Sequence, residues 1–295
     1  MTRLSSISIT LGLVAFAACG DSASSPPDAA AAPDATIPTA DAAPAAVTIP
    51  FTARLGSSAF SCGAAVDGIG SPAHTVTATD LRFYVYDVAL IASDGTSVPI
   101  ALDDDAFQHA GIALLDFENG CGTDGTPALH TSVTGTVAGT GFTGLSFTLG
   151  VPPDKDFVDL AAAAPPLDVT GMYWIWQYGY KFFKLDATVD VGTSTPAPYF
   201  LHLGSSGCPG SDATAPPTAP CAFPNRVTYT LDGFHVGQST VVVDVGAVLA
   251  NSDLSVNTAD TAPGCMSEPA DPECALVLPR MGVNTAAPQV LFSVQ

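Results

Sequence analysis

Short apolar runs, broken at close intervals by glycine and proline, recur through most of the chain and constrain its fold more than any other feature. In the run 81–91, apolar residues first alternate with Arg82, Tyr84 and Tyr86, and a turn sequence follows at 93–95. Such alternation predicts a β-strand with one buried face. Further strands are expected at 98–102, 112–117, 145–149, 172–191, 199–203, 227–231, 241–245 and 290–294.

Helical periodicity is scarce, and only residues 243–254 indicate a short helix. The 27 glycines and 25 prolines supply turns between many short strands. This pattern is typical of an all-β fold, and we predict an antiparallel β-sandwich with long loops that disulfides staple.

The N-terminus has the pattern of a lipoprotein signal. Arg3 precedes an apolar stretch of about a dozen residues, too short to span a bilayer, and Phe16-Ala17-Ala18-Cys19 closes it. We expect removal of residues 1–18 and lipidation of Cys19, which places the protein in the periplasm or at the outer membrane, held to the membrane by lipid alone. The alternative is a plain signal peptide followed by a chance cysteine.

Residues 19–46 are almost wholly Ala, Pro, Asp, Ser and Thr, and this composition predicts a disordered linker after the lipidated cysteine. Residues 47–295 show no second break in composition and are expected to form one domain. The formal net charge of −20 argues against nucleic acid and anionic membrane surfaces as partners.

Six cysteines follow Cys19, and an even number in an exported chain predicts three disulfides. Cys208 and Cys221 are close in sequence, as are Cys265 and Cys274, and both pairs lie in Pro- and Gly-rich loops. We therefore predict the bridges Cys208–Cys221 and Cys265–Cys274, with Cys62–Cys121 as a longer third. A thiolate metal site is the competing interpretation, although the chain has no Cys-x-x-Cys spacing.

Aromatic residues concentrate in the segment 172–182, which contains both tryptophans of the protein. On an extended strand Trp174, Trp176, Tyr178 and Tyr180 would share one face. One interpretation is a core strand rich in aromatic rings, and the other is an array of oxidisable rings near a reactive site. The composition of the segment does not decide between them.

His202 lies in an apolar run and offers either a core imidazole or a ligand for copper or zinc. The other four histidines are scattered, and the sequence contains no His-Glu-x-x-His, no Gly-x-Ser-x-Gly and no phosphate-binding or dinucleotide-binding glycine motif. The sequence therefore gives no support to an ordinary hydrolase.

Several blocks, taken together and in order, resemble the MbnP-like copper-binding proteins, also called metallo-mystery pair four-Cys proteins. The most specific blocks are Trp174-Ile175-Trp176-Gln177 and the run from His202 to Cys208, followed by three further cysteines that complete the four of the family's name. The full set of matching blocks is 80–85, 113–120, 144–152, 174–182, 202–208, 224–226, 231–234 and 263–267.

The resemblance implies an exported copper-binding protein whose partner is a di-haem protein of the cytochrome c peroxidase type. In that family the partner oxidises a tryptophan to kynurenine, and copper binding depends on the change. The resemblance therefore implies that this protein is the substrate of that reaction and not an enzyme. Carried over to this sequence, the kynurenine candidates are Trp176, which we favour at this point, and Trp174, while His202 is the expected copper ligand.

One departure from the family concerns a histidine that usually follows the Gly150-Val151-Pro152 block. This chain has Phe157 in that region, so copper binding is expected to be weakened, rebuilt or absent. The alternative function is a non-metallated cell-envelope module that binds a partner or a carbohydrate through a β-sandwich.

Overall fold

The computed structural model describes residues 43–295. The expected signal sequence, the lipidation site Cys19 and nearly all of the expected linker lie outside these residues. Within the described part, no helix combines the length and the apolar content needed to cross a membrane.

The larger of two sheets is built around the long strand β4 (His74–Ala92). β11 (Lys181–Asp190) pairs with the first half of β4 and β10 (Phe142–Leu149) with the second half. The order runs from β13 (Val227–Asp232) through β10, β4 and β11 to β12 (Ala197–Gly204) and β15 (Gly264–Cys265). Three short strands pair with the other edge of β4: β3 (Ala65–Ile69), β5 (Ser97–Pro99) and β8 (Ile112–Asp116). β7 (Gln108–His109) pairs with β8.

The smaller sheet is centred on β1 (Ala45–Leu55), which pairs with β14 (Val241–Asp244) on one side and β9 (Ser132–Val137) on the other. The pairing of β1 with β14 is parallel, as is that of β12 with β15, so the predicted antiparallel sandwich is correct except at these two contacts. The remaining strands of this sheet are β2 (Ser58–Ala59), β6 (Ala101–Leu102) and β16 (Phe292–Val294).

The two sheets enclose one apolar core. Alternate residues of β1 point inward, with Ile49 and Phe51 buried, and meet Phe83 of β4 and Phe147 of β10. Phe292 from β16 completes this group of edge-to-face aromatic rings. Each such ring buried from water contributes about 1.5–3 kcal/mol, so this cluster holds the layers together.

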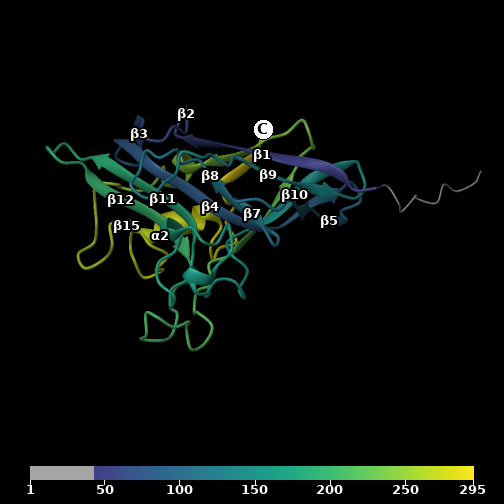
Figure 1. Ribbon diagram of the computed structural model, residues 1–295. Coiled ribbons are helices and arrows are strands. Elements are labelled where there is room, and N and C mark those ends of the chain that lie inside the picture. Colours follow the sequence, from purple (N-terminus) through teal and green to yellow (C-terminus); the bar gives the residue numbers. More distant parts are fainter. Residues whose placement is uncertain (1–42) are drawn as a thin grey trace, which may run out of the picture. The chain divides into compact units, whose positions relative to one another are not determined.

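The outer face of the larger sheet is covered as well. Residues 80–85 of β4 are buried on both faces. The loop between β10 and β11, with the 3-10 helices η1 (Leu160–Ala162) and η2 (Thr170–Met172), packs on this face around Tyr84, Tyr180 and Phe182. Figure 1 shows this loop on the side of β4 and β11 away from β1. A second, smaller core thereby lies outside the sandwich.

The prediction of one strand over 172–191 is wrong in its first half. A turn interrupts it, in which the backbone N–H groups of Tyr178 and Gly179 both donate to the carbonyl of Ile175. Gly179 has φ +66°, and a side chain there would collide with Asp156, so glycine is required. β11 begins only at Lys181, and the four aromatic residues 174, 176, 178 and 180 do not share a strand face.

The helices are short. α1 (Val245–Leu249) begins where Asp244 accepts the N–H of Ala247 at 2.7 Å, and it ends before the predicted residue 254. α2 (Cys274–Val277) continues into η3 (Leu278–Met281). The structure contains the same three disulfides that the spacing predicts, Cys62–Cys121, Cys208–Cys221 and Cys265–Cys274.

Candidate functional site

His202 stands on the outer face of the larger sheet, on β12, and is only 5% exposed. Its Nε2 lies 2.6 Å from Oδ1 of Asp186 on the neighbouring strand β11. Its Nδ1 is buried and has no hydrogen-bond partner within the described residues. Burial lowers the pKa of the imidazole, although the Asp186 charge opposes that shift, so one ring nitrogen is left with a free lone pair.

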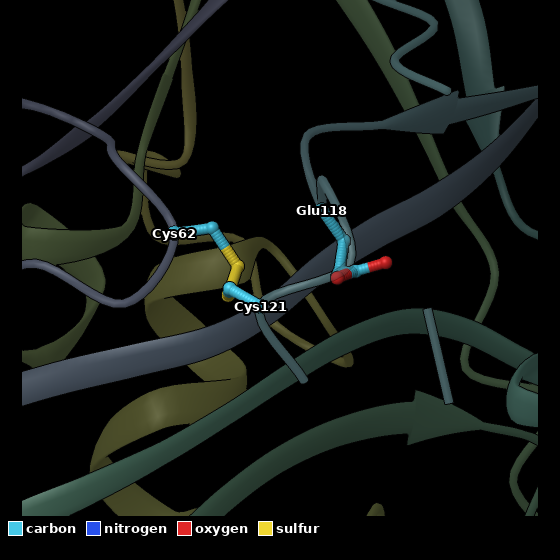
Figure 2. A group of neighbouring side chains, drawn as sticks. All are labelled: Cys62, Glu118 and Cys121. Atoms are coloured by element: carbon cyan, nitrogen blue, oxygen red, sulfur yellow. A yellow bond between two sulfur atoms is a disulfide. The ribbon is translucent and has the colours of Figure 1, made fainter. Parts of the chain in front are cut away.

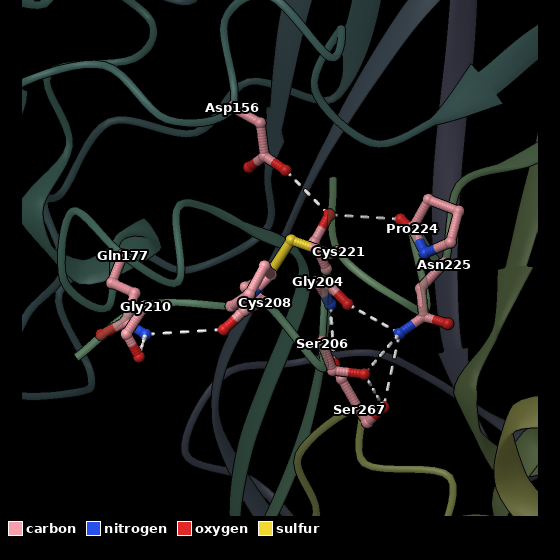
Figure 3. Close-up of a disulfide and its surroundings, with 12 residues drawn as sticks. Asp156, Gln177, Gly204, Ser206, Cys208, Gly210, Cys221, Pro224, Asn225 and Ser267 are labelled. Atoms are coloured by element: carbon pink, nitrogen blue, oxygen red, sulfur yellow. Dashed lines mark hydrogen bonds between the residues drawn. A yellow bond between two sulfur atoms is a disulfide. The ribbon is translucent and has the colours of Figure 1, made fainter. Parts of the chain in front are cut away.

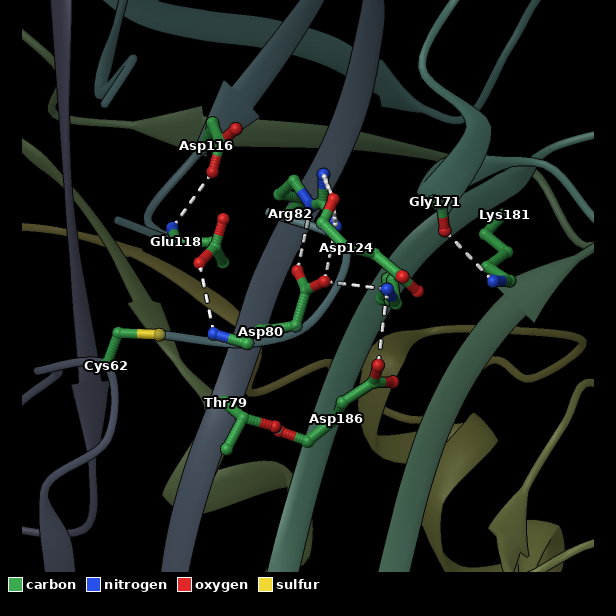
Figure 4. A network of polar contacts seen from close by, with 12 residues as sticks. Cys62, Thr79, Asp80, Arg82, Asp116, Glu118, Asp124, Gly171, Lys181 and Asp186 are labelled. Atoms are coloured by element: carbon green, nitrogen blue, oxygen red, sulfur yellow. Dashed lines mark hydrogen bonds and ion pairs between the residues drawn. The ribbon is translucent and has the colours of Figure 1, made fainter. Parts of the chain in front are cut away.

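A row of charged side chains crosses the same face beside His202. Lys184 Nζ lies 3.2 Å from Asp186 and 2.6 Å from Asp80, and Arg82 donates to both oxygens of Asp80. Figure 4 shows the row running across β4 and β11. The row can be buried because each of its charges has a partner of opposite sign. Lys184 also fixes the position of the Asp186 carboxylate, which is the partner of His202.

Trp174 follows η2 in the loop between β10 and β11, and its side chain lies close to His202. The centroids of its ring and of the His202 ring are 6.5 Å apart. The indole packs directly on Gly204, where a Cβ atom would lie 2.4 Å from Cζ3 of Trp174. Position 204 therefore requires glycine, because the indole occupies the space that a side chain would need.

A hollow of about 490 Å³ opens beside Trp174. Tyr178, which is 46% exposed, and Met266 are among the side chains that line it, together with Ser206 and the Cys208 bridge. The aromatic segment thus forms part of the wall of a surface hollow, and this arrangement differs from a plain core strand.

The backbone around His202 is clamped by side chains from three loops. Ser267 Oγ donates to the His202 carbonyl at 2.8 Å and accepts the N–H of Gly204 at 2.7 Å. Asn225 Nδ2 donates to the Gly204 carbonyl at 2.8 Å. Gln177 anchors the Cys208 loop through the Gly210 carbonyl at 2.5 Å, as Figure 3 shows around the Cys208–Cys221 bridge. These contacts tie the end of β12 to the loops that surround it.

Trp176 has different surroundings. Its Nε1 donates to the backbone carbonyl of Phe157 at 3.0 Å. The neighbouring Asp156 is buried and accepts hydrogen bonds from Ser205 at 2.8 Å and Arg226 at 2.7 Å. Burial raises the pKa of Asp156 to about 6. Phe157 lines a second hollow, of about 530 Å³, between Pro153 and the proline-rich loop 216–220.

The other four histidines do not belong to the group around His202 and Trp174. His130 Nδ1 donates to the Leu114 carbonyl at 2.7 Å, and the ring stacks on Phe107. His109 pairs with Asp104 at 2.9 Å, and His74 lies 3.7 Å from Asp253. His235 belongs to the turn that follows β13.

Within residues 43–295, one group of three His, Cys, Asp or Glu side chains has ligand atoms close enough to share a metal ion. It comprises Cys62, Glu118 and Cys121, shown in Figure 2. The two cysteines form a disulfide, so their sulfur atoms are not thiolates, and this group gives the thiolate-site alternative no support.

The structure brings the rings of His202 and Trp174 to a centroid distance of 6.5 Å, whereas Trp176 directs its Nε1 to the Phe157 carbonyl. It adds Asp186, which sequence reasoning missed. The only signal for Asp186 was its place in the alternating run Phe182, Lys184, Asp186, whose members share one face of β11.

The comparisons with known proteins agree with one another. The family model MbnP matches residues 44–267. The solved structure of MbnP from Methylosinus trichosporium superposes with a TM-score of 0.74 at 29% sequence identity, over 85% of this chain and 98% of that chain. No curated protein matches the sequence.

Proposed function

Because the chain belongs to the MbnP family, which is associated with copper binding, we propose that it is an exported lipoprotein that binds copper through His202 and an oxidised Trp174. The observation that carries the proposal is the buried, unpartnered Nδ1 of His202 beside the Trp174 indole. A buried polar atom without a partner costs about 1–3 kcal/mol, which a bound metal would recover.

His202 fits a metal ligand in a further respect. Histidines that bind metals usually hydrogen-bond to a carboxylate or carbonyl through their second ring nitrogen. In His202 this nitrogen is Nε2, and its partner is the Asp186 carboxylate. That contact fixes the ring and leaves Nδ1 as the donor. Copper accepts imidazole readily, whereas carboxylate is a less favourable ligand for it.

Trp174 is the better candidate for oxidation on geometric grounds. Its indole is adjacent to His202 and opens on a surface hollow, whereas Trp176 donates to the Phe157 carbonyl on the other side of Ser205. Oxidative cleavage of the indole C2–C3 bond adds two oxygen atoms supplied by peroxide, and hydrolysis then releases C2 as formate, so kynurenine is left with an aryl ketone and an aromatic amine. At position 174 this amine would be formed next to the His202 ring.

The oxidising equivalents require a partner, and a di-haem protein of the cytochrome c peroxidase type would supply them. In that reaction the chain is the substrate and not the catalyst. The role of its own residues is to hold the indole: Gly204 leaves room for it, and the clamp of Ser267 and Asn225 fixes the strand beneath it.

The absence of a histidine at Phe157 changes the donor set. Phe157 contributes a backbone carbonyl to Trp176 and an apolar ring to a separate hollow. We propose that the Met266 thioether, in the wall of the hollow beside Trp174, replaces the lost donor. A thioether is a soft ligand and favours Cu(I).

The proposal is tested by producing the lipoprotein together with its native haem partner and measuring metal content and the mass of the Trp174 peptide. We expect kynurenine at Trp174 and one tightly bound copper, and loss of the copper in His202→Ala. His109→Ala removes an exposed histidine and serves as the matched control. Copper retained in full by His202→Ala would contradict the proposal.

A second candidate function is a carbohydrate- or partner-binding module without a metal. The exposed Tyr178 beside Trp174 at the hollow favours it, because exposed aromatic rings are typical of such surfaces. This alternative requires that both tryptophans stay unmodified and that no copper is bound in the protein produced with its partner.

A further inference from the structure

A third pocket, of about 260 Å³, lies next to β12 at the opposite end of that strand from Gly204. Tyr199 of β12 and Ser252, from the segment that follows α1, contribute to it together with Glu273, directly before α2. The pocket is several times larger than the roughly 30 Å³ that one water occupies in the liquid.

Unpartnered polar atoms concentrate at this pocket. Within residues 43–295, six buried side-chain nitrogen or oxygen atoms have no hydrogen-bond partner. Three of them belong to its lining: Tyr199 Oη, Ser252 Oγ and Glu273 Oε2. A fourth, His74 Nε2, lies 3.7 Å from Oδ1 of Asp253, which also lines the pocket. Tyr199 is 2% exposed and Ser252 6%, so both side chains are almost wholly buried.

The electrostatic environment is negative. Glu273 uses Oε1 to accept the backbone N–H and the hydroxyl of Thr258, at 2.8 and 2.9 Å, and its pKa is lowered by its contact with the Asp271 carboxyl group and by Thr258. Asp271 is buried close by, with its pKa raised to about 6 by burial first and by the neighbouring Glu273. Tyr199 faces both carboxyl groups, and its pKa is raised by burial and then by their charges.

No lysine or arginine is among the described residues that line the pocket. Asp271 and Glu273 form no ion pair with a basic side chain in the described part of the chain. The two neighbouring carboxyl groups therefore have no basic partner within the described residues, and a cationic ligand would complement their charge.

The rim of the pocket is apolar. Val256 is 53% exposed and Leu276 52%, and both line the opening together with Pro272. They are two of the few large apolar side chains that the described surface exposes. An apolar rim above acceptor oxygens fits a ligand with a charged donor at one end and a short hydrocarbon chain at the other.

The geometry points to a binding site for a primary alkylammonium group, whose three N–H donors would be accepted by Glu273, Tyr199 and Ser252 while its alkyl chain lies against Val256 and Leu276. A bare divalent cation fits less well, because three His, Cys, Asp or Glu ligands do not converge here within the described residues. The site is separate from the one around His202 and does not depend on copper.

The test is calorimetric titration of the purified full-length protein with n-butylammonium chloride in phosphate buffer, since Tris is itself a primary amine. We expect saturable binding, with 1-butanol at least about tenfold weaker because it lacks the charge. Glu273→Gln should weaken n-butylammonium by at least about tenfold, and Asp232→Asn, an exposed carboxylate on β13, should leave it unchanged.

Tyr199→Phe gives an independent measurement that does not need the ligand. If the Tyr199 hydroxyl has no partner until a ligand binds, its removal leaves the free energy of unfolding of the amine-free protein unchanged or raised. The same substitution should weaken the binding of n-butylammonium. Nα-acetyl-lysine-N-methylamide distinguishes the source of the amine: tighter binding than n-butylammonium indicates a lysine of a polypeptide, and weaker binding indicates a small free amine.

The inference is overturned if n-butylammonium shows no saturable binding, if 1-butanol binds equally well, or if Asp232→Asn weakens binding as much as Glu273→Gln. A loss of stability in amine-free Tyr199→Phe would likewise contradict it, because that result means that ordered water alone satisfies the hydroxyl.

Discussion

His202 and Asp186 face each other across two neighbouring strands, with Nε2 of the imidazole 2.6 Å from Oδ1 of the carboxylate. This contact decides which nitrogen of His202 is free. Because Nε2 is engaged, Nδ1 is the nitrogen available next to Trp174. Asp186 is therefore a positioning residue for the proposed copper site, although it is not expected to bind the metal.

Replacement of Asp186 tests this role. Asp186→Asn keeps an acceptor of similar size but removes the charge, so we expect copper affinity to fall about 10–100-fold in protein produced with the haem partner. The metal-free variant should also show a changed His202 tautomer by nitrogen-15 NMR. Unchanged affinity together with an unchanged tautomer would contradict the assignment.

The buried charges behind Asp186 should matter for stability. Lys184→Met leaves Asp80 and Asp186 without their shared ammonium partner, and the loss of one partner from a buried pair costs about 3–5 kcal/mol. Urea unfolding measures this loss. Lys155→Met is the matched control, because its pair with Asp154 is solvent-exposed and its loss should cost less than about 1 kcal/mol. Equal effects of the two substitutions would rule out the structural role of the row.

The dependence of stability on pH should reveal the buried Asp116 at the end of the same row. Burial raises its pKa to about 7 in the folded protein, above its ordinary value. The folded state thus binds the proton more tightly than the unfolded state, and this group's contribution falls as pH rises from about 4 to 7.

Asp116→Asn removes this titration and can still accept the Glu118 N–H. The free energy of unfolding of the variant, relative to the unsubstituted protein, should therefore rise with pH by up to about 1.4 kcal/mol per pH unit. Urea unfolding between pH 4.5 and 7.5 provides the values. A difference that stays constant over this range would show that Asp116 titrates normally.

Gly204 tests the placement of Trp174. In Gly204→Ala the new methyl group overlaps the indole and the Tyr180 carbonyl, so we expect a stability loss of about 1–3 kcal/mol and a shifted indole emission in a Trp176→Phe background. Gly192→Ala meets open space and bears only the cost of its φ of +76°. Unshifted emission in Gly204→Ala would place the indole elsewhere.

Sequence patterns located some of the strands and missed others. The alternation around Arg82 and Tyr84 located β4, although the structure buries both faces of residues 80–85 and not one face as expected. β1 was missed, since Pro50 and the Ala- and Pro-rich sequence before it weaken its strand pattern. Residues 172–180 were assigned to a strand because aromatic alternation resembles one, whereas the Gly179 turn and the Asp156 anchor decide the fold there.

The site itself could be predicted only in part. His202 and the two tryptophans stood out as residue types, and the family resemblance gave them a role. Their grouping depends on strand register and loop packing, which bring Asp186 of β11 and Trp174 of the covering loop to His202 of β12. No local pattern contains that information, so our proposal of Trp174 in place of Trp176 rests on the geometry of the structure.

The central claim is tested most directly by peptide mass spectrometry and copper analysis of the lipoprotein produced with its haem partner. The account predicts kynurenine at Trp174, an intact Trp176 and copper bound in equal molar amount to the protein. Oxidation confined to Trp176, or two intact tryptophans without copper, would contradict it.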